Sequence, residues 1–205
     1  SIYNAYQGLF SMISYPKGIK KPVKSARKKV DQLVTNSYKN RGMSFEQEIN
    51  ASNAYYREIN RAIITKRPTP INVVKVDYAH GAKITHAYFE KQSTTDYNGI
   101  YQGRYVDFEA KSTQSSTSFP LANITSHQLA HLQAIIDHGG LAFFLIHFVR
   151  KDEVYVVKAE HILWHKVTQK RQSIPYSFIQ EKGEKVTLDL QPRLRYLDAV
   201  DRLFF

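Results

Sequence analysis

Cysteine is absent from the chain of 205 residues. This absence excludes a disulfide-stabilised scaffold and a metal site built on thiolates, and it fits a reducing compartment. Long apolar runs are absent too, since none approaches the roughly 20 residues that a helix needs to span a bilayer. No basic segment followed by an apolar one opens the chain, so no signal peptide is expected. We therefore expect a cytoplasmic protein without a membrane partner.

Acidic residues are scarce in the first part of the chain. Residues 1–41 hold nine lysines and arginines and one acid, Asp31, and so carry +8 of the chain's net charge of +11. Such clustered positive charge predicts a polyanionic partner, because neutralising phosphates releases their counterions. A solubilising tail is the alternative. The predicted DNA contacts in this part are Lys17, Lys20, Lys21, Lys24, Arg27, Lys28 and Arg41.

The length and the hydrophobic content of 42% predict one globular domain with a sizeable core. We place this domain at residues 25–205, after a flexible basic arm at residues 1–24. Periodicity predicts helices at 25–38, 45–63, 125–138 and 159–166, and near-helical spacing at 192–205. It predicts strands at 71–76, 83–89, 141–149, 153–158 and 186–190, with loops at 112–120 and 169–178. This order predicts an α/β or α+β fold, with a central mixed β-sheet flanked by helices.

Residues 94–111 form the most informative stretch, and their pattern predicts a β-hairpin. Strand-forming residues flank Gln102-Gly103, a two-residue turn with glycine where a positive φ is required. Asn98-Gly99 is an alternative turn of the same kind. We favour Gln102-Gly103 because it leaves a longer strand, from Arg104 to Lys111, to pair with the first.

The favoured turn brings four functional groups to one face of the hairpin. Asp96 lies opposite Glu109 and Thr94 opposite Lys111, whereas the alternative turn would pair Asp96 with Tyr101. Opposed side chains have Cβ atoms about 4.5–5.5 Å apart, so the two carboxylates repel each other. A hard divalent cation such as Mg²⁺ would compensate this repulsion. Lys111 beside them indicates phosphate chemistry; a solvated hairpin face is the alternative.

The helix predicted at 45–63 starts at a capping box formed by Ser44 and Gln47. Glu46 lies in its first turn and is a candidate accessory residue of the site. The alternative is that Glu46 complements the helix dipole.

The helix predicted at 125–138 carries Gln128 on an otherwise apolar stripe, where a buried polar side chain needs a partner. His127, His131 and His138 lie on the neighbouring face. A zinc site there would lack both the glutamate of the HExxH pattern and a clear third ligand, so contacts with solvent or phosphate are favoured.

Three segments resemble one known family. They are NRGMSFEQEINASNAYY (40–56), STTDYNGIYQGRYVDFEAKST (93–113) and HQLAHL (127–132). From about Tyr15 to its C-terminus, the chain resembles the RecU-type Holliday junction resolvases. These belong to the PD-(D/E)xK nuclease superfamily, which has the restriction-endonuclease-like fold. The proline of the superfamily's name is absent, since Thr95 precedes Asp96.

The resemblance implies roles for individual residues. Thr94, Asp96, Glu109 and Gln128 would be the positions of the magnesium site, and Lys111 would stabilise the transition state. Mg²⁺ is therefore the expected cofactor, with Mn²⁺ able to substitute for it.

The resemblance also implies an activity and partners. The chain would be an endonuclease that nicks symmetric strands of four-way junction DNA in homologous recombination and repair. It would act as a homodimer at the nucleoid, with a recombinase partner. A β stalk would project into the junction centre; we place it at residues 76–89, with Lys83 and His86 exposed.

Two other functions remain compatible with these residues. One is a catalytically lapsed protein that only binds branched DNA, and the other is a sequence-specific restriction endonuclease of the same fold. The intact set of Asp96, Glu109 and Lys111 favours an enzyme over a lapsed binder. A binder gains nothing from an unneutralised pair of carboxylates facing DNA.

Overall fold

The computed structural model describes residues 43–90 and 94–205. The predicted helix at 25–38 and the arm at 1–24 lie outside these residues. The described helices are α3 (Phe45–Glu58), α4 (Ser126–Asp137), α5 (Ala159–Gln169), α6 (Tyr176–Lys182) and α7 (Tyr196–Phe204), with short 3-10 helices η3 (Leu121–Asn123) and η4 (Val149–Lys151). The strands are β1 (Ile63–Lys66), β2 (Ile71–Asp77), β3 (Lys83–Phe89), β4 (Tyr97–Tyr101), β5 (Arg104–Thr113), β6 (Ser118–Pro120), β7 (Leu141–Phe148), β8 (Glu153–Lys158), β9 (Ser173–Pro175) and β10 (Gly183–Lys185).

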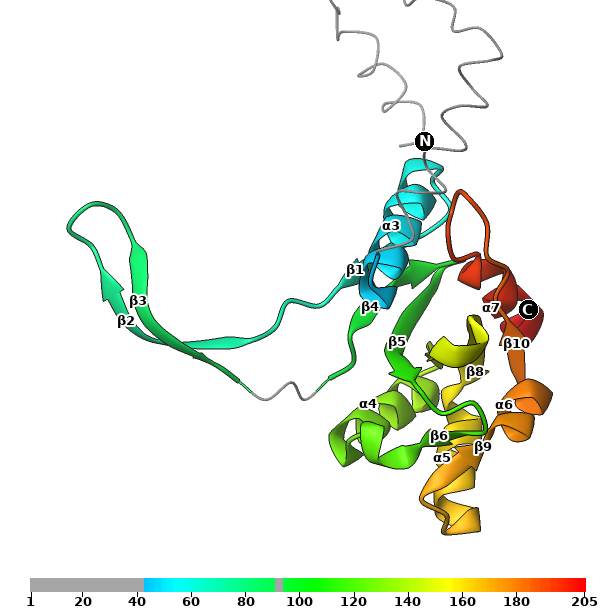
Figure 1. The fold of residues 1–205 in the computed structure, drawn as a ribbon. Helices are drawn as coiled ribbons and strands as arrows, with labels where there is room; N and C mark the ends of the chain where they lie inside the picture. Colours follow the sequence, from blue (N-terminus) through cyan, green and yellow to red (C-terminus); the bar gives the residue numbers. More distant parts are fainter. Residues whose placement is uncertain (1–42, 91–93) are drawn as a thin grey trace, which may run out of the picture. The chain divides into compact units, whose positions relative to one another are not determined.

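A six-stranded sheet with the order β1-β4-β5-β7-β8-β10 is the centre of the fold (Figure 1). β5 runs parallel to β7, and the other neighbouring pairs are antiparallel. β7 is buried along its length except at His147, as expected for a strand covered on both faces. The predicted mixed sheet flanked by helices is therefore confirmed.

Each face of the sheet has its own hydrophobic core. α3 and α7 cover one face, where Ile49 and Leu197 pack with Val106 and Phe108 of β5. α4 and α5 cover the other, where Leu132 and other apolar residues pack against β7 and β8. Because side chains alternate along a strand, β5 gives its apolar residues to the first core. Asp107, Glu109 and Lys111, which alternate with these apolar residues, point to the face of α4.

β4 and β5 form the predicted hairpin around Gln102-Gly103. Both turn residues have a positive φ, 48° and 73°, as a type I′ turn requires. Tyr97 pairs with Phe108, so the predicted register is confirmed and the alternative turn at Asn98-Gly99 is not used. Gly99 lies inside β4, where a Cβ would come within 2.0 Å of the carbonyl oxygen of Ile63.

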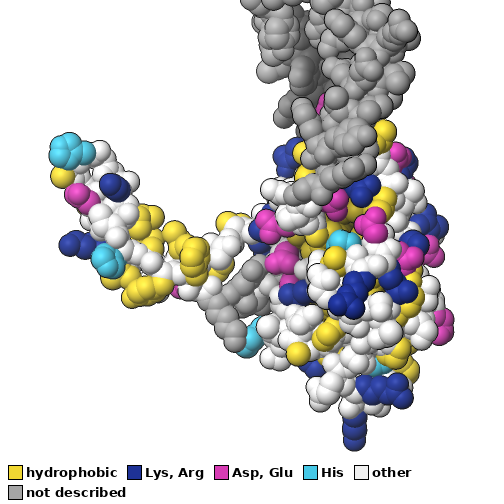
Figure 2. All heavy atoms as spheres, in the orientation of Figure 1, with side chains coloured by type: hydrophobic (Ala, Val, Ile, Leu, Met, Phe, Trp, Pro, Cys, Tyr) yellow, Lys and Arg dark blue, Asp and Glu magenta, His cyan; other side chains and the backbone are white. Residues whose placement is uncertain are grey.

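β2 and β3 form a two-stranded sheet of their own. Every residue of β3 is exposed, Lys83 and His86 included. Large hydrophobic side chains along the hairpin are open to solvent (Figure 2), namely Ile71, Val73, Val74, Ile84, Tyr88 and Phe89. The range expected for a stalk, 76–89, takes in all of β3 but only the end of β2. The exposed hairpin begins earlier, at Ile71.

α3 begins at the predicted capping box, in which Ser44 and Gln47 exchange hydrogen bonds. The predicted end of this helix at residue 63 is wrong. α3 ends at Glu58, Asn60 takes a positive φ of 56°, and residues 63–66 pair with β4. Asparagine tolerates this left-handed conformation, and the β-branched residues that follow favour the strand.

Three further predicted ranges are also wrong. The strand expected at 186–190 lies at Gly183–Lys185, which pair with β8, while Leu188 bridges to Leu194 within a local loop. The loop expected at 169–178 contains β9 and the start of α6, because Ile174 is buried and pairs with Phe119 of β6. The loop expected at 112–120 therefore also ends in a short strand. Short polar segments of this kind become strands only through such long-range pairing.

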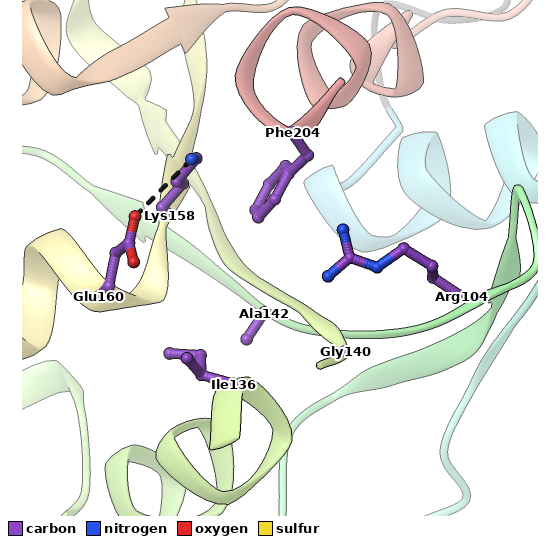
Figure 3. A pocket seen from close by; sticks show the side chains of 7 residues that line it. All are labelled: Arg104, Ile136, Gly140, Ala142, Lys158, Glu160 and Phe204. Carbon is purple, nitrogen blue, oxygen red and sulfur yellow. Dashed lines mark ion pairs between the residues drawn. The ribbon is translucent and has the colours of Figure 1, made fainter. Parts of the chain in front are cut away.

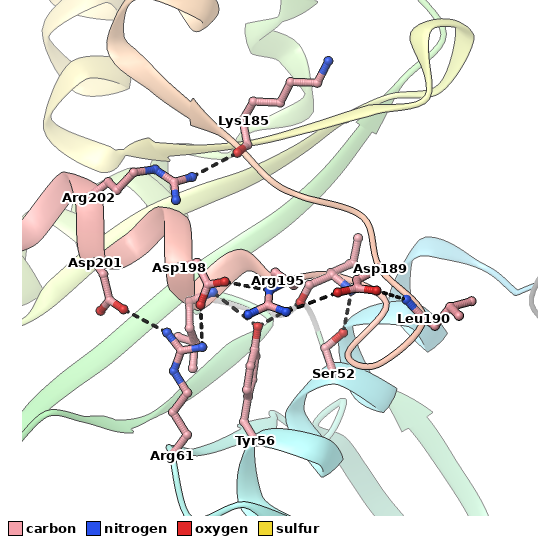
Figure 4. Close-up of polar contacts among 12 residues, drawn as sticks. Ser52, Tyr56, Arg61, Lys185, Asp189, Leu190, Arg195, Asp198, Asp201 and Arg202 are labelled. Atoms are coloured by element: carbon pink, nitrogen blue, oxygen red, sulfur yellow. Dashed lines mark hydrogen bonds and ion pairs between the residues drawn. The ribbon is translucent and has the colours of Figure 1, made fainter. Parts of the chain in front are cut away.

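Ion pairs hold α7 to the corner between α3 and β1 (Figure 4). Arg61 contacts Asp198 at 2.5 Å and Asp201 at 2.8 Å. Arg195 contacts Asp198 at 2.7 Å. Arg61 thus anchors α7, which with α3 covers the hydrophobic core on one face of the sheet.

Candidate active site

The register of the hairpin brings Asp96 and Glu109 into contact. The backbone N–H of Asp96 donates to Oε2 of Glu109 at 3.1 Å. The backbone N–H of Ala110 donates to Oδ2 of Asp96 at 3.4 Å. Each carboxylate is therefore held by a backbone N–H from the opposite side of the hairpin.

Glu109 is almost completely buried, with 1% of its surface exposed. Burial raises the pKa of its carboxyl group to about 7, and the charge of Asp96 raises it as well. Contact with Lys111 acts in the opposite direction. Two neighbouring carboxylates repel each other when both are ionised, so a bound cation would stabilise the ionised pair.

Lys111 extends from the same face of β5 as Glu109. Its Nζ lies 2.7 Å from Oε1 of Glu109, and its side chain is 23% exposed. The ammonium group of Lys111 is paired with Glu109 but is still partly exposed to solvent. It can therefore reach an anion that approaches the two carboxylates.

Gln128 is buried and contacts Glu109 from α4, so the partner expected for this polar residue is present. Its Nε2 donates to Oε1 of Glu109 at 2.6 Å. The orientation of its amide follows from a capping box at the start of α4. There Oε1 of Gln128 accepts from the backbone N–H of Thr125, and Oγ1 of Thr125 accepts from the backbone N–H of Gln128.

The donor set fits a hard cation such as Mg²⁺. Asp96 and Glu109 supply carboxylate oxygens, and burial and the charge of Asp96 raise the pKa of Glu109, which a bound cation would lower. Within the described ranges, no group of three or more His, Cys, Asp or Glu could hold a metal. Amide, hydroxyl, water or phosphate oxygens would have to complete the coordination, as is usual for Mg²⁺.

Asp96 also lines a cavity of about 310 Å³ with Glu46 and Tyr97. Glu46 forms an ion pair with Lys66 at 2.6 Å, so this candidate accessory residue lies beside the site without contacting either carboxylate in the described contacts. The Tyr97 hydroxyl is buried and has no hydrogen-bond partner among the described residues. Burial and the charges of Glu46 and Asp96 raise its pKa, which keeps it a neutral donor.

No described contact joins Thr94 or Lys83 to this pair. Thr94 is half-buried at the start of the segment that leads into β4. Lys83 lies on the exposed hairpin of β2 and β3. The predicted DNA contacts from Lys17 to Arg41 lie outside the described residues.

Sequence reasoning missed a second buried carboxylate, Asp107, which is 0% exposed. Arg67 forms an ion pair with it at 2.7 Å, and Nε2 of His131 lies 2.9 Å away. The hydroxyl of Thr95 donates to it as well. We call these four residues the Asp107 cluster. The sequence contains a signal for it, because Asp107 lies two residues before Glu109 and therefore on the same face of β5.

A second cavity, of about 240 Å³, lies at the opposite end of β5 (Figure 3). Arg104 begins β5 and binds the carbonyl oxygen of Gly139. Lys158 lies 3.7 Å from Glu160 and 4.9 Å from the ring centre of Phe204. These cations already have partners, and the cavity contains none of the predicted site residues.

A mixed sheet between helices, with Asp96, Glu109 and Lys111 together on one hairpin, is the arrangement of the PD-(D/E)xK class of nucleases. Comparison with known proteins is more specific. The model of the family described as RecU, Recombination protein U, matches residues 40–202. The chain belongs to this family.

Relatives align along nearly the whole chain. A Holliday junction resolvase RecU of Oceanobacillus iheyensis is 46% identical over 198 residues, which are 94% of this chain and 100% of that protein. Proteins of the same name from Geobacillus sp. (strain WCH70) and Bacillus cereus (strain B4264) are each 42% identical, over 95% and 94% of this chain and 98% of each relative. In the part of the chain that the structure describes, no helix is long and apolar enough to cross a membrane.

Proposed function

We propose that this chain is a Holliday junction resolvase: a Mg²⁺-dependent endonuclease that nicks symmetric strands of four-way junction DNA. The contact of Asp96 and Glu109 beside Lys111 is the observation that carries the proposal. Relatives over nearly the whole chain that bear this name support the choice of substrate. Mn²⁺ would serve as a substitute cofactor.

Asp96 and Glu109 would hold the cation between the two strands of the hairpin. The chemistry that Mg²⁺ supplies when bound is a polarised phosphate oxygen and a lowered pKa for water. Glu109 is fixed from three sides, by Lys111, by Gln128 and by the backbone N–H of Asp96. A fixed carboxylate does not have to reorganise when charge develops during hydrolysis.

Lys111 would offset the negative charge that develops on the phosphate in the transition state. Its ammonium group lies 2.7 Å from Glu109, so it is already directed at the position where a phosphate meets the carboxylates. Gln128 would orient Glu109 through its Nε2, while its Oε1 accepts from the backbone N–H of Thr125. Thr94 would complete the site from the segment before Asp96.

The assembly is part of the same proposal. Two copies of the chain would nick the two symmetric strands, since one site cuts one strand. The hairpin of β2 and β3 would be the stalk at the junction centre, where its exposed apolar side chains meet unstacked bases. Lys83 and the basic residues predicted as DNA contacts from Lys17 to Arg41 would bind phosphates. A cytoplasmic location at the nucleoid during repair, and a recombinase partner, are also part of this proposal.

The test is cleavage of a labelled four-way junction and of a linear duplex of the same sequences, with Mg²⁺ or with EDTA. We expect symmetric, Mg²⁺-dependent nicks in the junction alone. We expect Asp96→Asn and Lys111→Met to bind junctions as the wild type does and not to cut them. Light scattering of the complex should give two protein chains per junction.

Other outcomes identify the competing functions. Junction binding without cleavage in either Mg²⁺ or Mn²⁺ would leave a branched-DNA-binding protein. Cutting of the linear duplex at one sequence would indicate a restriction endonuclease. Loss of junction binding in both variants would mean that the two residues hold the fold or the DNA rather than the chemistry.

A further inference from the structure

The Asp107 cluster joins segments that are far apart in the sequence. Arg67 reaches Asp107 with both terminal nitrogens, at 2.7 and 3.4 Å. The same guanidinium donates to Oγ1 of Thr95 at 2.6 Å. His131 approaches the carboxylate from α4 at 2.9 Å. A carboxylate that is completely buried thus receives a two-pronged arginine, a hydroxyl group and a histidine.

Two members of the cluster flank the hairpin of β2 and β3. Arg67 precedes this hairpin and Thr95 follows it in the sequence. The backbone N–H of Arg67 also donates to the carbonyl oxygen of Asp96 at 2.7 Å. Further out, the backbone N–H of Glu90 donates to the carbonyl oxygen of Pro70 at 2.9 Å. The chain segments before β2 and after β3, which we call the stalk roots, are therefore bound to each other. Arg67 binds one root to Asp107, and Thr95 binds the other.

The other side of the cluster consists of elements that bear the candidate site. Asp107 lies two positions before Glu109 on the same face of β5. His131 lies one helical turn after Gln128 in α4. Thr95 directly precedes Asp96. Asp107, His131 and Thr95 therefore each lie close in the sequence to a different residue of the site.

A two-pronged ion pair with a buried carboxylate is geometrically specific, and either partner is costly to leave without the other. A displacement of Arg67 by the stalk would therefore move Asp107 with it rather than break the pair. The strand that carries Glu109 and the segment that carries Asp96 would move together.

We propose that Asp107 is a positioning residue that couples the stalk to the two carboxylates of the site. When the stalk engages a junction, the cluster sets Asp96 and Glu109 in the geometry for cleavage. This inference rests on the proposed function, because it presumes that the carboxylates serve the cleavage of a junction. It adds that cleavage by this chain depends on the stalk through one carboxylate that does not touch the substrate.

The test is a double-variant cycle in the full chain. One variant is Asp107→Asn, which keeps the shape and removes the charge. The other replaces residues 73–87 with Asn-Gly, which leaves both stalk roots in place. Single-turnover cleavage is measured on junctions that are fully bound, and binding is measured separately in EDTA. We expect each change to lower the cleavage rate at least about tenfold, as loss of a supporting contact does in metal sites.

Coupling predicts that the two losses do not multiply. The combined variant should cut within about threefold of the slower single variant. We also expect Asp107→Asn to need more Mg²⁺ for half of its maximal rate. Arg67→Lys, which keeps the charge but not the two-pronged contact, should cut at a rate between those of the wild type and Arg67→Gln.

Glu153→Gln is the matched control. Glu153 accepts hydrogen bonds from Tyr155, Tyr176 and Lys185 on β8 and its neighbours, so its loss disturbs a comparable network away from the site. It should lower the melting temperature without changing the cleavage rate or the Mg²⁺ requirement.

Two results would overturn the proposal: wild-type cleavage by folded Asp107→Asn, or losses that multiply in the combined variant. If Asp107→Asn does not fold, Arg67→Gln takes its place in the cycle, and multiplying losses there overturn the proposal equally. Failure of the proposed function looks different, because the wild type itself would then not cut junctions.

Discussion

At the scale of single residues, the charge of Glu109 depends on its surroundings, since burial and the charge of Asp96 raise its pKa from 4.5 to about 7. Between these pH values the unfolded chain loses the proton while the folded chain keeps it. The free energy of unfolding of the metal-free protein should therefore fall as the pH rises through this window. Thermal unfolding in EDTA between pH 4.5 and 8 measures this, and Glu109→Gln should remove the contribution of Glu109 to the slope.

Mg²⁺ should reverse the effect, because it binds the ionised carboxylates. The rise in melting temperature on adding Mg²⁺ should be larger at pH 8 than at pH 5.5, and it should be small in Glu109→Gln at both. The same pH slope in Glu109→Gln and the wild type would show that another group is responsible.

The residues of the site differ in how far the sequence predicts them. Asp96, Glu109 and Lys111 come together from one turn and the two-residue period of strands, which are local rules. The contact of Gln128 with Glu109 depends on how α4 packs on the sheet, so the sequence predicts only that this amide needs a partner. Asp107 was overlooked although the same period places it beside Glu109, because its partner Arg67 directly follows β1, a strand that the sequence did not predict.

At the scale of elements, the start of α4 fixes the amide that contacts Glu109. Thr125→Ala should remove the hydroxyl of the capping box and lower the free energy of unfolding by about 1 kcal/mol. It should also release the amide of Gln128 and raise the Mg²⁺ concentration needed for half-maximal cleavage. Urea unfolding and a Mg²⁺ titration of the cleavage rate measure the two effects.

Thr125→Ser is the control for this change, since serine caps a helix as well as threonine does. It should behave as the wild type in both measurements. If Thr125→Ala lost stability but kept the Mg²⁺ dependence of the wild type, the capping box would stabilise the helix without orienting Gln128.

The corner at Arg61 provides a second prediction at this scale. Burial acts to raise the pKa of Asp198, but Arg195 and Arg61 outweigh it, so the pKa lies below its usual value. The stabilisation is therefore present above pH 3.8 and is lost as the pH falls through the lowered value. Arg61→Met should cost on the order of 2 kcal/mol in urea unfolding at pH 7, with junction binding unchanged.

An exposed ion pair serves as the control for Arg61. Lys182 contacts Glu181 at 2.9 Å with both side chains open to solvent. Lys182→Met should change the free energy of unfolding by less than about 0.5 kcal/mol. Equal losses in the two variants would mean that the corner contributes no more than a surface pair.

Elements with strong local signals follow the sequence closely. β8 lies at 153–158 as predicted, and the capping boxes mark the starts of both core helices. The failures are short segments such as β1 and β9, whose pairing partners lie about 33 and 55 residues away in sequence. Local pattern does not determine such pairs, because the free energy of pairing comes from the partner strand and its neighbours.

At the scale of the whole molecule, charge is concentrated in one part of the chain. Residues 1–41 carry nine basic residues and one acid, whereas the rest of the chain is close to balance. If phosphates are the partners of residues 1–41, affinity for DNA should depend on salt through these basic residues. Cleavage, in contrast, should depend on the carboxylates of the hairpin.

Deletion of residues 1–24 removes four lysines and no acid. If each lysine neutralises one phosphate, the slope of log K for junction binding against log salt should become less negative by up to about 3.6. The cleavage rate of fully bound junctions should not change, because the site lies on the hairpin of β4 and β5. Deletion of residues 1–15, which contain no lysine, arginine or acid, is the matched control and should leave the slope unchanged. An unchanged slope in the longer deletion would show that the arm does not bind DNA, and the positive charge would then serve solubility.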